Sequence, residues 1–230
     1  MPRAPIADMI APFEVLPAQE LSEGKPIVAR LIGRRFEQLL DGRFDRPFDG
    51  ELGKMMVKTL SHLCATLGAT FGYAERHEIS LFAISNGGEA RRLVSRIGGE
   101  AAAKMSLLLG DIATFDTRLY EFPGPDGVIQ YFGWRRQEAL AQALDAYSSH
   151  VLISQGAEPD AVPRILDGLG PDEKVELLRQ NEFDFLAVPA WQRQGVGVYV
   201  ERAPDGSHLV VDMQLPAIDA YGAYLQKFVA

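Results

Sequence analysis

Residues 70–84, ATFGYAERHEISLFA, constrain the fold of this chain more than any other stretch. Apolar residues fill both ends of the stretch, and the run Glu75-Arg76-His77-Glu78 interrupts them. This pattern predicts two strands folded back over a charged tip. Because successive side chains of a strand point to opposite faces, we expect Glu75 and His77 on one face and Arg76 and Glu78 on the other.

The elements around this hairpin predict an α+β fold. A strand is expected at 26–32, and Gly33 leads from it into a short helix at 34–41. A capped helix follows from Asp49 to Gly68, and Asn86 with Glu89 predicts a capping box for the next helix. With a strand at 114–122, the order is strand, helices, strand, strand, helix, strand. This order is typical of a ferredoxin-like domain, an antiparallel sheet with helices on one face.

The second half of the chain is predicted to be mainly helical and to end in a hairpin. We expect three parts, an irregular N-terminal arm marked by prolines and a glycine, a domain with a helical extension, and a C-terminal extension packed on the same domain. The three parts are residues 1–25, 26–202 and 203–230. The expected helices and strands of the second half are a long helix at 126–155, helices at 159–167 and 171–180, a hairpin around 204–206, and a terminal helix at 217–228.

Composition limits the binding partners and the cellular location that we expect for this protein. The net charge of −8 gives no bulk attraction to nucleic acid or to an anionic membrane, so any RNA contact needs a local basic patch. The single cysteine, Cys64, lies on the apolar side of a helical pattern, which predicts a buried, inert thiol. No apolar run approaches the ~20 residues of a membrane span. We therefore expect a cytoplasmic protein without a membrane partner.

Several short motifs, in order along residues 26–201, resemble those of the tRNA-histidine guanylyltransferases and their relatives, which add nucleotides in the 3′-to-5′ direction. The resemblance implies a palm domain that uses two aspartates, two Mg²⁺ ions and GTP to modify a tRNA, and it implies a homo-oligomer, a dimer or a tetramer. No counterpart is evident after residue 203. The motifs are RLIGRRF (30–36), FDRPFD (44–49), YAERHEIS (73–80), FDTR (115–118), WRRQ (134–137), GLGPDEKVELL (168–178) and PAWQRQGVGVYVE (189–201).

The residues that the family uses for metal binding are replaced in this chain. The family pattern R-L-D-G-R has Ile32 at its aspartate, and the pattern S-D-E becomes Arg76-His77-Glu78. The family's H-x-N-N falls on Leu140-Ala141-Gln142-Ala143. His77 and Glu78 are the remaining metal candidates, but a lone His-Glu pair is far short of a zinc site, and a charged hairpin tip is the favoured interpretation. Mg²⁺ binding is therefore expected to be lost.

Residues suited to binding a phosphate group remain in this chain. Gly33 allows close approach of the backbone to a ligand, and an arginine fork binds phosphate without a metal. A turn bearing solvated arginines is the alternative interpretation. By resemblance, the candidate nucleotide-binding residues are Gly33, Arg34, Arg35, Phe36, Arg46, Arg76 and Lys174.

Three functional hypotheses follow from these residues. The first is a degenerate guanylyltransferase-like protein that binds GTP, another nucleotide or a tRNA end without chemistry, or that partners a competent paralogue. The second is an active nucleotidyltransferase that takes carboxylates from elsewhere, such as Glu75 and Glu78. The third is a structural or interaction protein that keeps only the fold, so the sequence leaves open whether the chain is an enzyme.

Two further pairs of residues carry structural expectations. Trp134 and Trp191 are predicted to be packing anchors rather than base-stacking platforms. Asp116 and Arg118, at family positions, are predicted to form an ion pair at the edge of the sheet.

Overall fold

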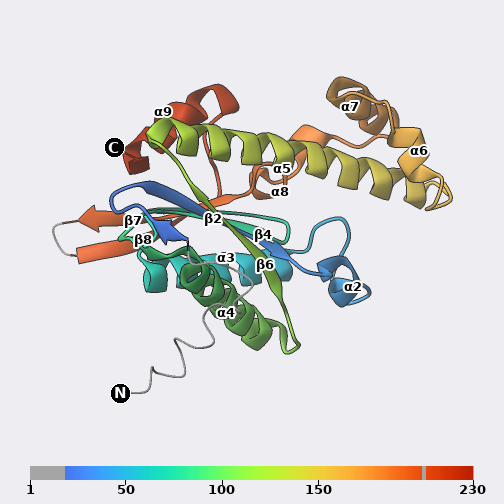
Figure 1. The fold of residues 1–230 in the computed structure, drawn as a ribbon. Coiled ribbons are helices and arrows are strands. Elements are labelled where there is room, and N and C mark those ends of the chain that lie inside the picture. The colour runs from blue at the N-terminus through green and yellow to red at the C-terminus, as the bar shows by residue number, and fades with distance from the viewer. Residues whose placement is uncertain (1–18, 204–205, 230) are drawn as a thin grey trace, which may run out of the picture.

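The computed structural model describes residues 19–203 and 206–229, in which helices pack on a central sheet (Figure 1). The first half of the chain contributes β1 (Glu20–Leu21), β2 (Pro26–Gly33), α2 (Phe36–Leu40), α3 (Gly50–Leu67), β3 (Phe71–Glu75), β4 (Glu78–Ile84), β5 (Gly88–Glu89), α4 (Ala90–Leu109) and β6 (Phe115–Glu121). The second half contributes α5 (Pro125–Ser154), α6 (Val162–Leu166), α7 (Pro171–Gln180), the 3₁₀ helix η2 (Phe185–Ala187), α8 (Ala190–Gln194), β7 (Val196–Ala203), β8 (Gly206–Asp212) and α9 (Ile218–Val229).

The central sheet has six strands in the order β6-β2-β4-β3-β7-β8, and all neighbouring strands are antiparallel. Strand β2 lies between β4 and β6, so Ile32 pairs with Glu78 on one side and with Asp116 on the other. The predicted strand at 26–32 and the predicted hairpin at 70–84 therefore belong to one sheet. The α+β fold class with an antiparallel sheet is confirmed, and the C-terminal hairpin β7–β8 extends this same sheet.

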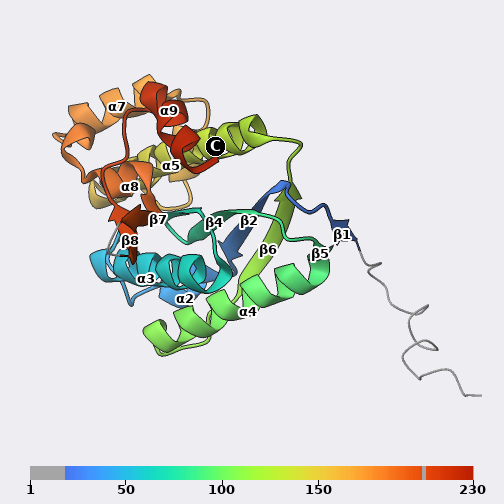
Figure 2. The same ribbon diagram turned by 90° about the vertical axis from the view of Figure 1, so that its left-hand side faces the viewer.

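Helices α3 and α4 cover one face of the sheet (Figure 2). Leu31 and Ile79 project from the sheet into a core that also holds Leu60 of α3 and Ile97 of α4, all of them buried. Helix α3 begins as predicted, because the Asp49 carboxylate accepts hydrogen bonds from the second and third amides of the helix. It also ends as predicted, at Gly68 in the left-handed conformation.

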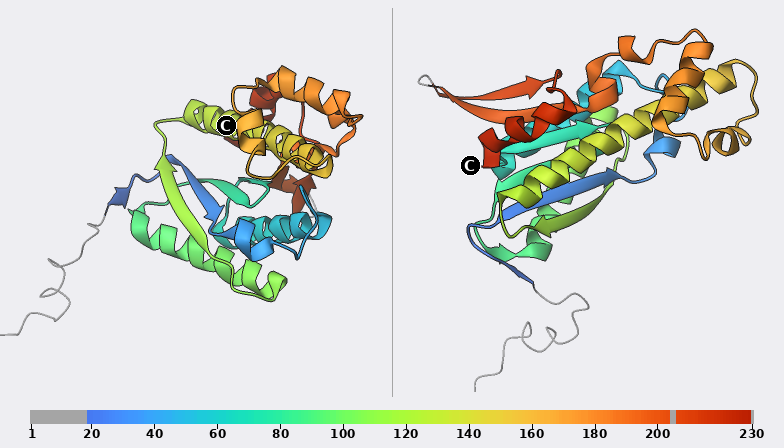
Figure 3. Two further views of the ribbon diagram at one scale, coloured as in Figure 1. Left: turned by 90° about the vertical axis from the view of Figure 1, so that its right-hand side faces the viewer. Right: turned by 90° about the horizontal axis from the view of Figure 1, so that it is seen from above.

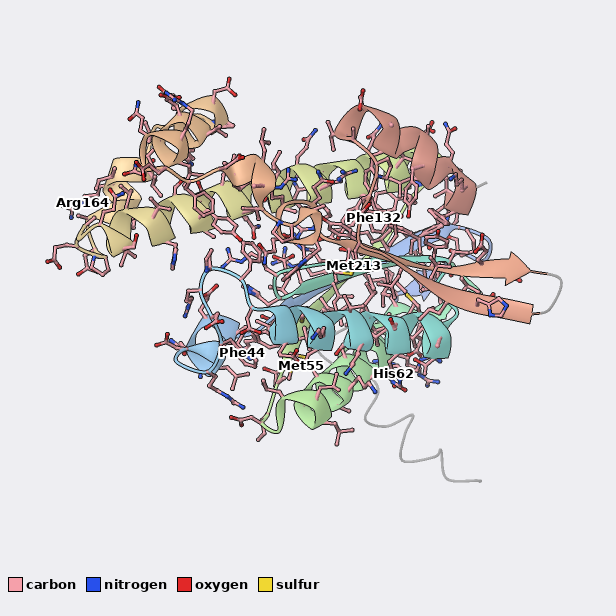
Figure 4. The ribbon with its side chains drawn as sticks, turned by 180° about the vertical axis from the view of Figure 1, so that it is seen from behind. Phe44, Met55, His62, Phe132, Arg164 and Met213 are labelled. Carbon is pink, nitrogen blue, oxygen red and sulfur yellow. The ribbon has the colours of Figure 1, made fainter. Side chains whose placement is uncertain are left out.

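Helices α5 and α9 cover the opposite face (Figure 3). Phe132 of α5 points toward the sheet (Figure 4) and meets Phe71 edge to face at 5.0 Å, while Phe228 of α9 stacks on the same ring at 4.9 Å. The expectation of helices on one face thus holds for α3 and α4. The helical second half supplies the cover for the other face.

Residues of α5, α7 and the 3₁₀ helix η2 form a third core, and α6 and α8 also contact α5 (Figure 1). Tyr147 of α5 contacts the rings of Phe183 and Phe185, and Leu178 of α7 is fully buried beside them. This packing attaches residues 162–188 to the long helix, whereas β7 and β8 return to the sheet.

Several predicted boundaries are wrong. The helix predicted at 34–41 spans only 36–40, because Arg35 adopts a left-handed φ of 57°. Similarly, the helix predicted at 159–167 is confined to 162–166. The capping box at Asn86 does not form. Instead, Gly88 and Glu89 pair with β1, and α4 begins at Ala90.

Part of the N-terminal arm is described. Residues 19–25 include β1, and the amide of Ala90 donates to the carbonyl of Gln19 at 2.8 Å, which fixes this segment beside the start of α4. The rest of the predicted arm, residues 1–18, lies outside the described residues. Among the residues that the structure describes, no helix has the length and apolar character that a membrane crossing requires.

Candidate functional site

The site lies where β2 ends beside the tip of the β3–β4 hairpin. The amide of Gly33 donates to the carbonyl of His77 at 3.0 Å, so the two positions at which the family pattern has aspartates, 32 and 77, are brought close together. Ile32 is only half-buried and projects from the same face of the sheet as Glu78, its cross-strand partner.

The hairpin tip differs from the prediction. Glu75 and Glu78 are cross-strand partners, so they share one face, and Arg76 and His77 form a two-residue turn between them. Arg76 has a left-handed φ of 43°. Simple alternation fails here because the turn itself does not continue the strand.

The turn after β2 exposes two arginines and buries a phenylalanine. Arg34 and Arg35 are exposed, and within the described part of the chain neither side chain has an ion pair or hydrogen bond. Phe36 is 1% exposed and packs against the His77 and Phe115 rings, at 5.9 and 5.2 Å between centroids. A Cβ added to Gly33 would lie 2.6 Å from the Phe36 ring, so the ring and the turn require glycine at this position.

A small cavity of about 70 Å³ opens between α2, the loop before α3, the hairpin tip and Trp191. Phe44, Phe48 and Trp191 supply aromatic walls, and Arg46 and Arg76 supply positive charge. The carboxylates of Glu37, Asp45 and Asp49 also line it. Aromatic walls with a few charged groups are a common lining of small-molecule sites.

One carboxylate holds both arginines of this cavity. Glu37 accepts a hydrogen bond from Arg46 at 2.8 Å and another from Arg76 at 3.0 Å, and Arg46 also contacts Asp41 at 3.1 Å. Burial alone would raise the pKa of Glu37, but the Arg46 hydrogen bond and the neighbouring positive charges outweigh it, and the pKa is lowered. Burial, followed by the Arg76 charge, lowers the pKa of His77, which favours the neutral imidazole. Because all of these ion pairs are partly exposed, an anionic ligand can compete for Arg46 and Arg76.

A buried network of charges lies on the other side of the hairpin. Arg135 of α5 is fully buried and donates to both Glu75 and Glu78, the latter at 2.8 Å, while Arg30 donates to Glu78 at 2.7 Å. The Trp134 ring, 41% exposed, lies 5.2 Å from the Arg30 guanidinium and 5.1 Å from that of Arg135. Two carboxylates and two guanidiniums thus neutralise each other beneath a tryptophan.

The charge on Glu75 is sensitive to its surroundings. Burial raises the pKa of Glu75 to about 7, against the lowering effect of the Arg135 charge. One of its oxygens is buried and has no hydrogen-bond partner within the described residues. Local sequence patterns do not reveal this network, because Arg135 lies 57 to 60 positions from its partners along the chain.

The metal candidates do not gather into a metal-binding set. The Glu78 carboxylate is occupied by two arginines, and His77 packs on Phe36. Within residues 19–203 and 206–229, no three His, Cys, Asp or Glu side chains are grouped so that they could hold a metal ion.

Lys174 does not join the other candidate nucleotide-binding residues. It lies on α7 and donates to Asp145 of α5. It lines a second cavity of about 580 Å³ that shares no lining residue with the first. The other six candidates lie at the turn after β2, at the hairpin tip and in the loop before α3.

Two smaller predictions have clear outcomes. Cys64 is 1% exposed and burial raises the pKa of its thiol to about 12, which confirms an inert thiol. Asp116 and Arg118 are both exposed, and within the described chain they form no ion pair with each other, so that prediction is wrong. They occupy alternate positions on the edge strand β6, so they share one face of the sheet. On that face Arg118 lies opposite Arg30, and Asp116 lies opposite Ile32.

Solved structures share this fold. A bacterial tRNA(His) guanylyltransferase-like protein in complex with GTP aligns with 97% of this chain and 98% of its own, with a TM-score of 0.79 and 24% identity. The tRNA(His) guanylyltransferase of Saccharomyces cerevisiae aligns with 89% of this chain and 96% of its own, with a TM-score of 0.74 and 19% identity. The fold therefore defines a protein of the palm-fold class to which these structures belong.

The sequence places the chain within one family of that class. The profile of the tRNAHis guanylyltransferase family matches residues 8–127, more than half of the chain, and the chain belongs to this family. The alignment with the bacterial structure extends over 97% of the chain, whereas the family profile ends at residue 127.

Other relatives have different names. A protein of Mycobacterium tuberculosis, named as a proposed S-adenosyl-L-methionine-dependent methyltransferase, is 25% identical over 80% of this chain. The alignment spans only 53% of that protein, so this chain corresponds to about half the length of such relatives. The uncharacterized protein R259 of Acanthamoeba polyphaga mimivirus is 21% identical over 84% of this chain and 76% of its own length.

Proposed function

We propose that this family member binds a nucleoside triphosphate such as GTP, or the end of a tRNA, and carries out little or no metal-dependent transfer. The observation that carries this proposal is the exchange of charges at the hairpin tip. Where the family has two aspartates, this chain has Ile32 and His77, with Arg76 beside them. The chain keeps arginines at the turn and the cavity that suit an anion, and positions 32 and 77 lack the carboxylates that would suit a dication.

The donor set does not fit Mg²⁺. Magnesium takes oxygen ligands in near-octahedral geometry, whereas Ile32 offers none and His77 offers a nitrogen. Glu78 is the remaining carboxylate of the motif, and Arg30 and Arg135 already neutralise it. The same contacts argue against an active enzyme that recruits Glu75 and Glu78, because removing them from Arg135 would leave a buried cation without a partner.

Arginine contacts support metal-free binding of the phosphates. The exposed Arg34 and Arg35 follow Gly33, and Arg46 and Arg76 lie at the cavity. A guanidinium binds phosphate through a planar fork of N–H donors, and it carries its charge without a bound ion. The aromatic walls suit a nucleobase, and the GTP held by the solved bacterial relative supports this class of ligand.

Several finer expectations belong to this proposal. Phe36 is buried, so its part in binding would be through its backbone, and Lys174 would act at the separate α5–α7 cavity. A tRNA and a competent paralogue are the proposed macromolecular partners, and self-association as a dimer or tetramer is proposed for the chain itself. Location in the cytoplasm remains a prediction.

Nucleotide-dependent thermal stabilisation tests the binding. A ligand that binds only the folded state adds about 2.7 kcal/mol of stability at a concentration of 100 times its Kd. We expect GTP to raise the midpoint with EDTA present, and Arg46→Ala to weaken the apparent affinity about 10- to 100-fold, as the loss of one charged hydrogen bond implies. Arg179→Ala is the matched control, because Arg179 is an exposed, ion-paired arginine on α7. An equal loss in both variants, or no shift with GTP, would contradict the proposal.

A transfer assay tests the absence of chemistry. Labelled GTP is incubated with a mixture of tRNAs, with and without Mg²⁺, and incorporation is measured. We expect none above background in either condition. Strong Mg²⁺-dependent incorporation by the unaltered protein would overturn the proposal and assign an active nucleotidyltransferase.

A further inference from the structure

Two arginines of the candidate site share one carboxylate. Oε2 of Glu37 accepts a hydrogen bond from Nη1 of Arg46 at 2.8 Å, and Oε1 accepts one from Nη2 of Arg76 at 3.0 Å. Glu37 belongs to α2, Arg46 to the loop before α3, and Arg76 to the hairpin tip. One side chain therefore joins three segments around the cavity, with one oxygen for each guanidinium.

A carboxylate in this position resembles a bound phosphate group. Its oxygens accept from both guanidiniums as phosphate oxygens would, and all three side chains line the cavity. Although burial alone would raise the pKa of Glu37, the Arg46 hydrogen bond and the Arg76 charge lower it. The side chain is therefore anionic at neutral pH, and it uses donors that an anionic ligand would need.

The other carboxylates that line the cavity have different roles. Asp49 accepts from three backbone amides and caps α3, and Glu75 is bound by Arg135. In the part of the chain that the structure describes, Asp45 has no ion pair with either arginine of the cavity. Among these lining residues, Glu37 is thus the carboxylate that holds the arginines.

The position of Glu37 allows its carboxylate to leave the arginines. The side chain is 55% exposed, whereas its neighbour Phe36 is buried and anchors α2, so the carboxylate can turn into solvent while the helix stays in place. Arg46 would keep Asp41, at 3.1 Å, but Arg76 has no second carboxylate within ion-pair distance among the described residues. Displacement of Glu37 therefore frees Arg76 more completely than Arg46.

We propose that Glu37 is an internal competitor for the phosphate site, which an anionic ligand must displace before it binds Arg46 and Arg76. This inference rests on the proposed function and assigns a residue that limits the affinity of the site. Because exposed ion pairs are individually weak, removing the competing charge should tighten the binding of a polyanion by about 3- to 30-fold.

Calorimetric titration of inorganic pyrophosphate, with EDTA present, tests this role. Glu37→Gln keeps the shape of the side chain and removes its charge, and we expect the Kd of this variant to lie about 3- to 30-fold below that of the unaltered protein. Glu51→Gln is the matched control, because Glu51 is an exposed carboxylate at the start of α3 that pairs with Lys54 instead of the cavity arginines. At physiological ionic strength, where distant charges are screened, the control should leave the Kd within about 2-fold. Circular dichroism shows whether each variant is folded.

A double-mutant cycle assigns the effect to displacement rather than to net charge. Arg76→Ala should weaken pyrophosphate binding more in the Glu37→Gln background than in the unaltered protein, because the guanidinium is fully available only without its competitor. Equal effects in the two backgrounds, a Glu37→Gln variant that binds pyrophosphate no more tightly, or the same gain from Glu51→Gln would each overturn the inference. The same titrations with GTP separate the two proposals. If GTP binds neither protein while pyrophosphate still binds Glu37→Gln more tightly, the proposed function fails and the competitor role stands.

Discussion

Replacing Arg135 with methionine should destabilise the protein in a pH-dependent way. Methionine keeps much of the length of the arginine side chain but removes the guanidinium that binds both Glu75 and Glu78. Glu78 retains Arg30 at 2.7 Å, whereas the described structure offers Glu75 no second basic partner within hydrogen-bond distance. Glu75 is therefore the group whose charge state sets the free energy of the variant.

The magnitude follows from the burial of Glu75. Removing one partner of a buried ion pair costs about 3–5 kcal/mol when the other stays charged. The pKa of Glu75 is already raised from 4.5 to about 7, so between these two pH values the native state holds a proton that the unfolded state has lost. The free energy of unfolding consequently falls as the pH rises from 4.5 to about 7. Without Arg135, the pKa of Glu75 rises further and the fall extends to higher pH.

Urea unfolding followed by circular dichroism measures this effect. We expect Arg135→Met to lose about 3–5 kcal/mol at about pH 8, where Glu75 must either stay charged without a partner or hold a proton that the unfolded chain has lost, and only about 1–3 kcal/mol at about pH 5.5, where Glu75 is neutral. Adding Glu75→Gln to the variant should recover part of the loss at the higher pH alone. A loss that is equal at both values, or below about 1 kcal/mol at about pH 8, would refute the assigned role of the network.

Three further predictions follow from single contacts. Gly33→Ala should lower the free energy of unfolding by about 1–3 kcal/mol in denaturant titration, because the added Cβ would lie 2.6 Å from the Phe36 ring. An unchanged free energy of unfolding would show that the ring can move. Asp49→Ala should cost about 1 kcal/mol in the same titration through loss of the α3 cap, and an unchanged free energy of unfolding would show that this cap does not stabilise the helix. Ile32→Asp combined with His77→Asp should create Mg²⁺ binding, measured by calorimetry. Transfer activity should stay absent, because Arg76 remains and the H-x-N-N match is missing. Failure of the double variant to bind Mg²⁺ would mean that these two positions do not face a common ion.

The sequence predicted the hairpin and the long helices because their signals are local. The Asp49 cap, the Gly68 stop and the apolar periods lie within one or two turns of the residues that they affect. Asn86 shows where local signals fail. Its capping pattern was sound, but the pairing of Gly88 with Leu21, a contact between distant segments, moved the start of α4 to Ala90.

The candidate site was predictable only in part. The turn at Gly33 and the hairpin tip meet as the motifs indicated, because adjacent strands of one sheet bring them together. The partnership of Arg135 with Glu75 and Glu78 joins residues 57 to 60 positions apart, and no local pattern records it. Nor could spacing show that Lys174 lies at a different cavity, since that depends on how α7 folds back along α5.

Calorimetric titration of GTP into the unaltered protein, first with EDTA and then with excess Mg²⁺, tests the central claim most directly. The account predicts saturable binding in EDTA with a Kd that changes by less than about 10-fold, or 1.4 kcal/mol, when Mg²⁺ is added. Binding that appears only with Mg²⁺ would show that the protein holds a metal ion at a site that the replaced aspartates do not define, and would contradict the account.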